Sequence, residues 1–367
     1  MNNKNHRRTD LLLLVSVFLL LTVGLTMIYS SSSIIALSRY HDGLYFLRRQ
    51  FIAVVIGMIL LVLLTKVSYQ SLHRLAAYVF VFSILLLMAL FIPHVGVRVN
   101  NATRWLRLGG INFQVTELVK ITLVLFLAHY FATHEKKIPE FKRGFLVPLG
   151  IVLFVVLLIV PQPDFGTAAI IAFITLCLLF LAGVKFRYLM GFFVCLLPGA
   201  IWLVLKSDYR LERLKILFNP WKDPLGTGFQ IIQSFISFGS GGFFGVGIGD
   251  GMQKLYYLPE PHTDFILSVI AEEGGFIAVC AVIFLFVVFI IRGFLIAYGA
   301  PDLFGTLLAA GITMTIAVEA AVNIAGVMGL IPVKGLALPF VSYGGSSVTM
   351  SLAGVGLLLN VYAASHR

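Results

Sequence analysis

The stretch that decides the fold is LLLLVSVFLLLTVGLTMIYS, residues 11–30, which follows HRRTD at residues 6–10. Twenty mostly apolar residues are about the length that an α-helix needs to cross the hydrocarbon core of a bilayer. A basic segment before an apolar run is also typical of a secretory signal peptide, but this run is too long and no clean small-x-small cleavage site follows it. The sequence therefore predicts an uncleaved first membrane helix.

Nine further apolar stretches follow, so we predict an all-α, polytopic integral membrane protein with about ten transmembrane helices in a single membrane domain, residues 1–367. The expected spans are residues 11–34, 48–65, 73–93, 114–132, 144–160, 165–183, 187–205, 266–291, 303–326 and 343–363. Composition agrees, because 59% of the residues are hydrophobic and only 12% are charged, whereas a soluble domain carries roughly 25% charged residues.

The basic residues predict the orientation of the chain. Ten spans place both termini on one side of the membrane. If that side is the cytoplasm, the inner segments hold thirteen Lys and Arg residues and the short outer loops hold seven, which is the bias expected of a cytoplasmic membrane protein. We therefore predict cytoplasmic termini and a long extracytoplasmic loop, residues 206–264, between the seventh and eighth helices. That loop is rich in Gly and aromatic residues, unlike a disordered linker, and is expected to fold back onto the bundle at the membrane surface.

The net charge of +11 does not indicate a nucleic-acid partner, because the basic residues are spread over short loops and form no patch. Weak attraction to anionic lipid headgroups is the simpler consequence. Cys177, Cys195 and Cys280 lie inside apolar spans and have no partner at metal-ligand spacing. No metal site is therefore predicted from protein ligands alone.

The segment PEPHTDFILSVIAEEGG, residues 259–275, stands at the mouth of the expected eighth span. Thr263 or Asp264 could cap this helix by accepting first-turn N–H groups, or Asp264 could act as a general base facing a cavity at the outer surface. The two roles conflict in part, because N–H donors lower the pKa of a carboxylate. Glu272 and Glu273 follow on different faces of the helix, so at least one is expected to be a buried, hydrogen-bonded packing residue.

The start of the expected fourth span carries a second polar cluster. Gln114, Glu117 and Lys120 recur every three residues and so share one side of the helix. Glu117 and Lys120 could simply neutralise each other. Alternatively, Lys120 and the nearby Arg104 could bind a pyrophosphate, because phosphate groups are recognised by cations near the membrane surface.

Three further motifs are less specific alone. In PQPDFGT, residues 161–167, Asp164 could merely cap the sixth span. The stretch FNPWKDPLGTGFQIIQS, residues 218–234, which includes Gln233, indicates a structured loop. In GLIPVKGLALPFVSYGGSS, residues 329–347, the small residues before the last span permit close helix packing or leave N–H groups free for an anion.

Together these motifs resemble the SEDS family (shape, elongation, division and sporulation), and more its division branch than its elongation branch. The matching stretches occur in family order and are RWLRLGGINFQVTELVK, QPDFGT, NPWKDPLGTGFQIIQS, LPEPHTDFILSVIAEEGG and PVKGLALPFVSYGGSS. The resemblance implies a peptidoglycan glycosyltransferase that polymerises lipid II at the outer face of the cytoplasmic membrane. The implied partners are lipid II, the growing glycan strand, a class B penicillin-binding protein transpeptidase and other membrane proteins of the division complex.

The resemblance also implies roles for individual residues, with Asp264 as the catalytic base. The expected substrate-binding residues are Arg104, Glu117, Lys120, Asp164, Gln233, His262, Lys334 and Ser346. Positive charge for the leaving pyrophosphate would come from Arg104 and Lys120, or from a divalent cation, Mg²⁺ or Mn²⁺, bound through the phosphates. A lipid II flippase and a non-catalytic division scaffold are the alternatives. The polar residues gather toward the outer half of the bundle, which favours the enzyme.

Overall fold

The computed structural model describes residues 10–93, 95–99, 102–108, 111–206, 217, 219–226, 228–255, 258–333 and 335–366. Its α-helices are α1 (Leu11–Tyr40), α2 (Tyr45–Lys66), α3 (Tyr69–Ala89), α4 (Val115–Thr133), α5 (Val147–Ile159), α6 (Phe165–Leu181), α7 (Phe186–Leu205), α9 (Phe229–Gly241), α10 (Ile266–Tyr298), α11 (Leu303–Val327) and α12 (Gly345–Ser365). Short turns of 3-10 helix lie at Glu135–Lys137 and Pro220–Lys222, and one of π-helix at Phe141–Leu146.

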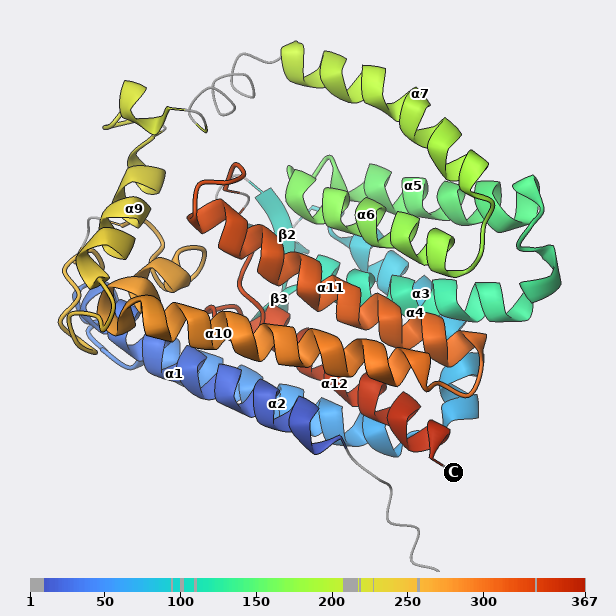
Figure 1. Cartoon of the computed structure of the whole chain (residues 1–367), viewed down its shortest axis with the longest axis horizontal. Coiled ribbons are helices and arrows are strands. Elements are labelled where there is room, and N and C mark those ends of the chain that lie inside the picture. The colour runs from blue at the N-terminus through green and yellow to red at the C-terminus, as the bar shows by residue number, and fades with distance from the viewer. Residues whose placement is uncertain are drawn as a thin grey trace, which may run out of the picture.

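Each of the ten predicted spans coincides with one of these helices (Figure 1). Within the described residues, eight helices are long and apolar enough to cross a membrane, counting the π-helical turn with α5, and α6 and the first part of α7 are shorter apolar helices. The all-α, polytopic class is confirmed, and the count of ten crossings stays a prediction.

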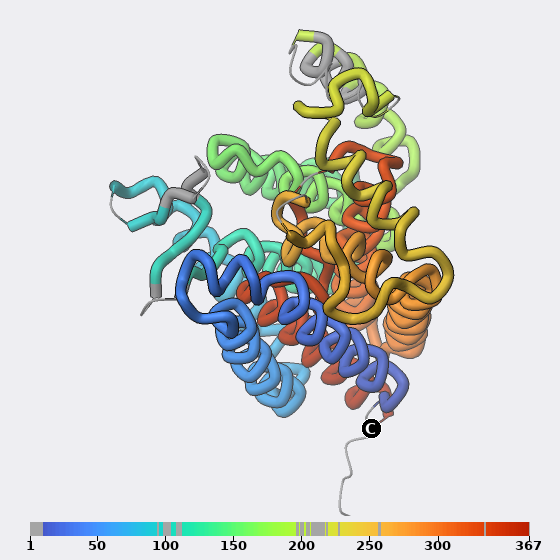
Figure 2. Tube along the Cα trace, turned by 90° about the vertical axis from the view of Figure 1, so that its left-hand side faces the viewer, coloured from blue at the N-terminus to red at the C-terminus, as the bar shows by residue number. Residues whose placement is uncertain are grey.

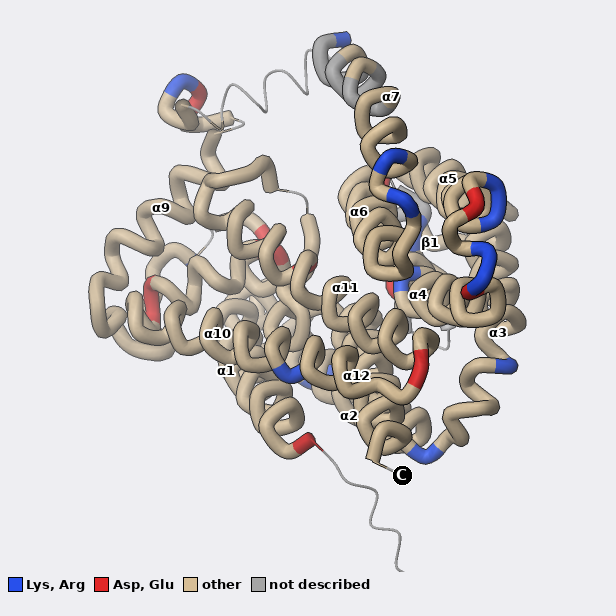
Figure 3. Tube along the Cα trace, turned by 45° about the vertical axis from the view of Figure 1, so that its right-hand side comes forward, with Lys and Arg blue, Asp and Glu red and all other residues tan. Residues whose placement is uncertain are grey.

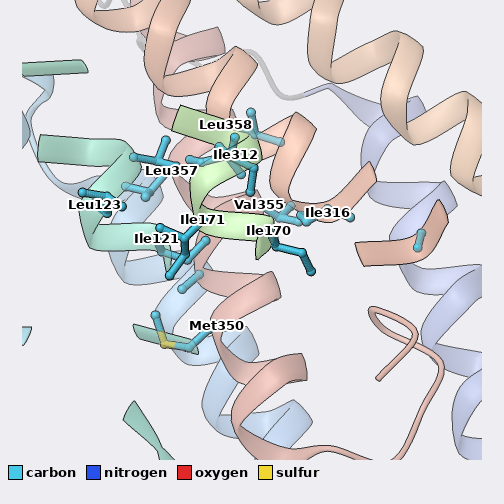
Figure 4. Packing of buried hydrophobic residues seen from close by; sticks show 14 of the residues in the cluster. Ile121, Leu123, Ile170, Ile171, Ile312, Ile316, Met350, Val355, Leu357 and Leu358 are labelled. Carbon is cyan, nitrogen blue, oxygen red and sulfur yellow. The ribbon is translucent and has the colours of Figure 1, made fainter. Parts of the chain in front are cut away.

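The centre of the bundle is formed where α4, α6, α11 and α12 meet. Figure 4 shows Ile121 and Leu123 from α4, Ile171 from α6 and Ile312 from α11 among the branched aliphatic side chains that fill this region. Helix α12 is buried along most of its length and also packs on α2. Gly356 permits this close approach, since a Cβ atom there would lie 2.7 Å from the carbonyl oxygen of Leu61.

A small antiparallel sheet, which was not predicted, precedes α4. Its strands are β1 (Gly96–Val99), β2 (Ala102–Leu108) and β3 (Ile111–Gln114), in the order β1-β2-β3. Figure 2 shows this segment projecting to one side of the helices. Strand β3 runs directly into α4, so the sheet fixes how the fourth span begins.

The segment after α7 returns to the bundle, as expected, because α9 packs against α10. Beyond α9 the chain follows α10 at a break in that helix, where Gly275 has φ 69° and ψ −169°. Near this break, backbone hydrogen bonds join the chain after α9 to α10. Val246 N and Gly247 N donate to the carbonyl oxygens of Glu272 and Glu273, at 3.0 and 3.1 Å. The extracytoplasmic position of residues 206–264 stays a prediction.

Candidate active site

The residues singled out from sequence gather at one end of the bundle, where α1 ends and α4, α6, α10 and α12 begin. Two hydrogen bonds join distant segments there: Tyr343 N donates to His262 O at 2.8 Å, and Gln114 N donates to Ser346 Oγ at 2.8 Å. The opposite end holds the start of α1. Figure 3 shows Lys and Arg residues clustered at the α4–α5 and α6–α7 connections, which join those helices at that opposite end.

Asp264 lies two residues before the first residue of α10, and it does not cap that helix. The N-cap is Phe265, which makes no side-chain cap hydrogen bond, and the Thr263 hydroxyl donates instead to Glu260 O at 3.2 Å. The capping role is therefore wrong for both Thr263 and Asp264. Among the described residues, none donates a hydrogen bond to the Asp264 carboxylate.

The loop that carries Asp264 is fixed against the segment before α12. Ser342 Oγ donates to Thr263 O at 2.6 Å, while Tyr343 N bonds to His262 O. Gln50 of α2 reinforces this contact, because its Nε2 donates to Ser342 O at 3.1 Å. Backbone atoms on both sides are thus held by buried side chains, which is the kind of support that a precisely placed functional group needs.

The surroundings of Asp264 favour a proton-accepting role. Burial, together with the nearby negative charge of Glu260, raises the pKa of the Asp264 carboxyl from 3.8 to about 6. Burial also lowers the pKa of His262, whose ring packs against Phe46 at a centroid distance of 4.5 Å. At neutral pH, Asp264 is therefore mostly ionised yet more basic than an ordinary aspartate, as a general base should be.

Arg104 and Asp164 are brought together at the start of α6. Asp164 caps this helix by accepting from Thr167 N at 3.3 Å, so the simple capping role is confirmed. Arg104 Nη1 lies 3.9 Å from Asp164 Oδ1, and the same guanidinium donates to the carbonyl oxygens of Gln162 and Pro163 at 2.9 and 2.6 Å. The side chain of Arg104 keeps 26% exposure, so part of its donor edge stays accessible to an anion.

Lys120 lies between two carboxylates inside the bundle. Its Nζ donates to Glu117 Oε1 at 2.9 Å and forms a second ion pair with Glu319 of α11, and all three residues are buried. The neutralising role that the i, i+3 spacing left open is therefore present, and phosphate binding by Lys120 stays a prediction. Glu319 was missed, although a carboxylate inside the span 303–326 was itself a signal.

The other predicted binding residues are more scattered. Ser346 joins α12 to the start of α4 through its bond with Gln114, and half-buried Gln233 lies on α9. His262 adjoins Asp264, whereas Lys334 lies outside the described residues. Substrate contact by these four residues stays a prediction.

Glu272 and Glu273 are both buried packing residues, which confirms the expectation that at least one would be. The carboxylate of Glu272 accepts from Met252 N at 2.8 Å. The carboxylate of Glu273 accepts from Lys254 Nζ at 2.6 Å and from Ser30 Oγ of α1 at 2.7 Å. These bonds fix the chain after α9 to both α1 and α10.

No group of three or more His, Cys, Asp or Glu residues within the described part of the chain is placed to hold a metal ion. A divalent cation bound through the substrate's phosphates stays a prediction.

The fold and the site define a polytopic membrane protein with a carboxylate at the mouth of its helices that accepts no hydrogen bond from the described residues and has a raised pKa. Residues 10–367 match the model of the FtsW/RodA/SpoVE family, described as "Cell cycle protein", and the chain belongs to this family. The match confirms the resemblance that the sequence motifs carry.

Individual relatives agree. The chain is 46% identical over 355 residues to "Probable peptidoglycan glycosyltransferase FtsW" of Trichlorobacter lovleyi, and the aligned residues cover 96% of this chain and 93% of the relative. It is 42% identical over 352 residues to "Stage V sporulation protein E" of Bacillus subtilis, and the aligned residues cover 96% of each protein.

Solved structures resemble the fold along nearly the whole chain. The rod shape determining protein RodA of Thermus thermophilus superposes with a TM-score of 0.72 at 28% identity, covering 99% of each chain. A chain from a structure described as "Structural coordination of polymerization and crosslinking by a peptidoglycan synthase complex" gives a TM-score of 0.79 at 33% identity, covering 98% of this chain and 99% of that one.

Proposed function

We propose that this protein is a peptidoglycan glycosyltransferase that polymerises lipid II into glycan strands during cell division, with Asp264 as the general base. Two relatives that match over more than 90% of their length, from Trichlorobacter lovleyi and Geobacter metallireducens, are each named "Probable peptidoglycan glycosyltransferase FtsW". The observation that carries the residue assignment is the Asp264 carboxylate, which accepts no hydrogen bond from the described residues and has its pKa raised to about 6. Purified protein incubated with lipid II, with and without a transpeptidase partner, tests the proposal by formation of glycan polymer.

The chemistry needs one base and a stabilised leaving group. Asp264 takes the proton of the 4-hydroxyl group of the acceptor's N-acetylglucosamine. The oxygen of that hydroxyl group bonds to the donor's anomeric carbon, and the bond from that carbon to pyrophosphate breaks. Inversion at that carbon requires only this one base, whereas retention requires a second carboxylate about 5 Å away. The accessible edge of Arg104, alone or with a divalent cation, would stabilise charge on the departing pyrophosphate.

Two buried polar clusters indicate the depth of this site. Asp10 pairs with Arg292 at 2.5 Å, and Ser30 bonds to Glu273. At about 1.5 Å of rise per residue, Asp10 and Ser30 are roughly 30 Å apart along α1, which is about the thickness of the hydrocarbon core. Ile266 lies about 10 Å beyond Glu273 along α10. Asp264 would therefore lie at the headgroup level, where the pyrophosphate of a lipid-linked sugar is found.

We also propose that the protein lies in the cytoplasmic membrane with both termini in the cytoplasm and residues 206–264 outside, because the inner segments of this arrangement hold more Lys and Arg residues than the short outer loops. We expect a cysteine that replaces Lys222 to react with an impermeant thiol reagent in intact spheroplasts, and one that replaces Lys137 to react only after lysis. Both variants are made in a background without the three native cysteines. Labelling of position 137 but not of position 222 in intact cells would reverse the topology.

A class B penicillin-binding protein is the proposed partner, and other division proteins of the membrane are further candidates. The support is the similar chain whose structure is described as belonging to a peptidoglycan synthase complex. A flippase is less well supported, because Lys120 inside the bundle is already engaged by ion pairs with Glu117 and Glu319. A scaffold would make no polymer in the lipid II assay.

The rate of polymerisation is expected to depend on pH through Asp264. A base must be deprotonated to act, so activity should rise as pH increases through about 6 and level off above it. The measurement is the initial rate of polymer formation between about pH 5 and pH 8. The rise in rate with pH should persist in the His262→Gln variant. If the rise disappears in that variant, the group that titrates is His262 and not Asp264.

A further inference from the structure

We propose that Asn323 of α11 is a positioning residue for Asp264, holding the backbone that carries the base. The inference rests on the proposed role of Asp264, and it concerns a residue that no sequence motif singled out. Asn323 is buried within an apolar helix, where a polar amide is costly unless it has partners.

The amide nitrogen of Asn323 joins two segments that are far apart in the sequence. Its Nδ2 donates to Asp264 O at 3.0 Å and to Leu336 O at 2.7 Å. The Asn323 amide thereby holds Asp264, two residues before α10, against the segment before α12. Asp264 is not held by capping α10, so the hydrogen bond from Asn323 Nδ2 to Asp264 O directly constrains the main chain of Asp264.

The same side chain shares a small cavity with Asp264. The cavity is lined by Asp264, Val322, Asn323, Gly326, Val327, Val333, Gly335 and Leu336. Asn323 Oδ1 is buried without a hydrogen-bond partner among the described residues. Gly335 has φ 66°, and a Cβ atom there would lie 3.5 Å from Asp264 Oδ2. The Asn323 amide and the Asp264 carboxylate therefore border the same small cavity.

Position matters for a general base because proton transfer requires hydrogen-bond geometry. A displacement of about 1 Å can lower the rate about 100-fold. Removing the two donors of Asn323 releases Asp264 from Leu336 without altering the carboxylate itself. The expected loss is therefore in kcat rather than in lipid II binding.

Few other charges face Asp264 from the elements that surround it. Glu260 lies in its own loop, and Glu272 and Glu273 of α10 are engaged by the chain after α9. Helix α11 contributes the neutral Asn323 and, one turn further along, Glu319, which is paired with Lys120. Lys334 lies outside the described residues. A new negative charge at position 323 should therefore act strongly on the Asp264 carboxylate.

The test compares Asn323→Asp and Asn323→Ala with a matched control, Asn360→Asp. Asn360 of α12 is also buried, and its Nδ2 likewise donates to two carbonyl oxygens, those of Leu64 at 2.7 Å and Val67 at 2.8 Å, at the opposite end of the bundle. Thermal melting, kcat and KM for lipid II, and the pH–rate profile are measured for each variant with the full chain in detergent.

Asn323→Asp should lower kcat about 10- to 100-fold, with KM changed less than about 3-fold. Its rising limb in the pH–rate profile should lie about one pH unit higher than in the wild type. Asn323→Ala should show the same kcat loss without the upward shift, and it replaces the Asp variant if that variant does not fold. Asn360→Asp should lower the melting temperature while kcat and the pH limb stay as in wild type.

Unchanged kcat in Asn323→Ala, or an equal loss of kcat in Asn360→Asp, would overturn the positioning role. Asp264→Asn is measured in parallel and separates the two proposals. If that variant still polymerises lipid II, the assignment of the base fails. If it is inactive while the Asn323 variants behave as wild type, only the positioning role fails.

Discussion

Asp264→Asn is expected to abolish polymerisation of lipid II while leaving the fold intact. Asparagine has the same shape as aspartate but accepts no proton near neutral pH, and general base catalysis contributes typically 10²–10⁴-fold to the rate. The carboxylate accepts no hydrogen bond from the described residues and does not cap α10, so its replacement should remove little stabilising contact. The measurement is gel analysis of glycan products, together with thermal melting and partner binding.

Asp302→Asn is the matched control for this change. Asp302 caps α11 by accepting from Gly305 N at 2.9 Å and lies at the opposite end of that helix from Asn323. Asparagine caps helices about as well as aspartate, so the control should retain both activity and melting temperature. Long glycan strands made by a well-folded Asp264→Asn protein would remove Asp264 from catalysis and direct attention to the carboxylates at Asp164 and Glu272.

Much of the fold could be predicted because membrane spans are a local property of the sequence. About twenty apolar residues in a row have few alternatives in a bilayer, so each of the ten stretches became a helix. The sheet at residues 96–114 was missed because two of its strands have only four residues. In the seven-residue strand β2, the apolar residues Trp105 and Leu106 are adjacent, which breaks the alternation of apolar and polar residues that indicates a strand.

The sequence singled out residues of the candidate site but did not predict which of them pair with distant residues. Spacing along one helix suggested the Glu117–Lys120 pair, yet the second partner of Lys120 lies 199 residues away, and Ser30 lies 243 residues from Glu273. Periodicity carries no information about which helices become neighbours. Asn323 was missed for the same reason, since its importance comes from two carbonyl groups on separate loops.

The second large effect is expected from Lys120→Met, which should strongly destabilise the protein. The change leaves the buried carboxylates of Glu117 and Glu319 without their common cation. Breaking a buried ion pair by removing one partner costs about 3–5 kcal/mol, whereas replacing all partners by neutral groups is often nearly neutral. The triple variant Glu117→Gln/Lys120→Met/Glu319→Gln should therefore recover most of the melting temperature that Lys120→Met loses.

Activity of the triple variant then separates the two roles of Lys120. If the amine serves only to neutralise Glu117 and Glu319, a triple variant that melts like wild type should also polymerise lipid II at a comparable rate. If Lys120 also binds pyrophosphate, the triple variant should be stable but slow, because neutral side chains cannot stabilise charge on the leaving group. A triple variant as unstable as Lys120→Met would contradict the neutralising role itself, since no unpaired charge remains in it to account for the loss.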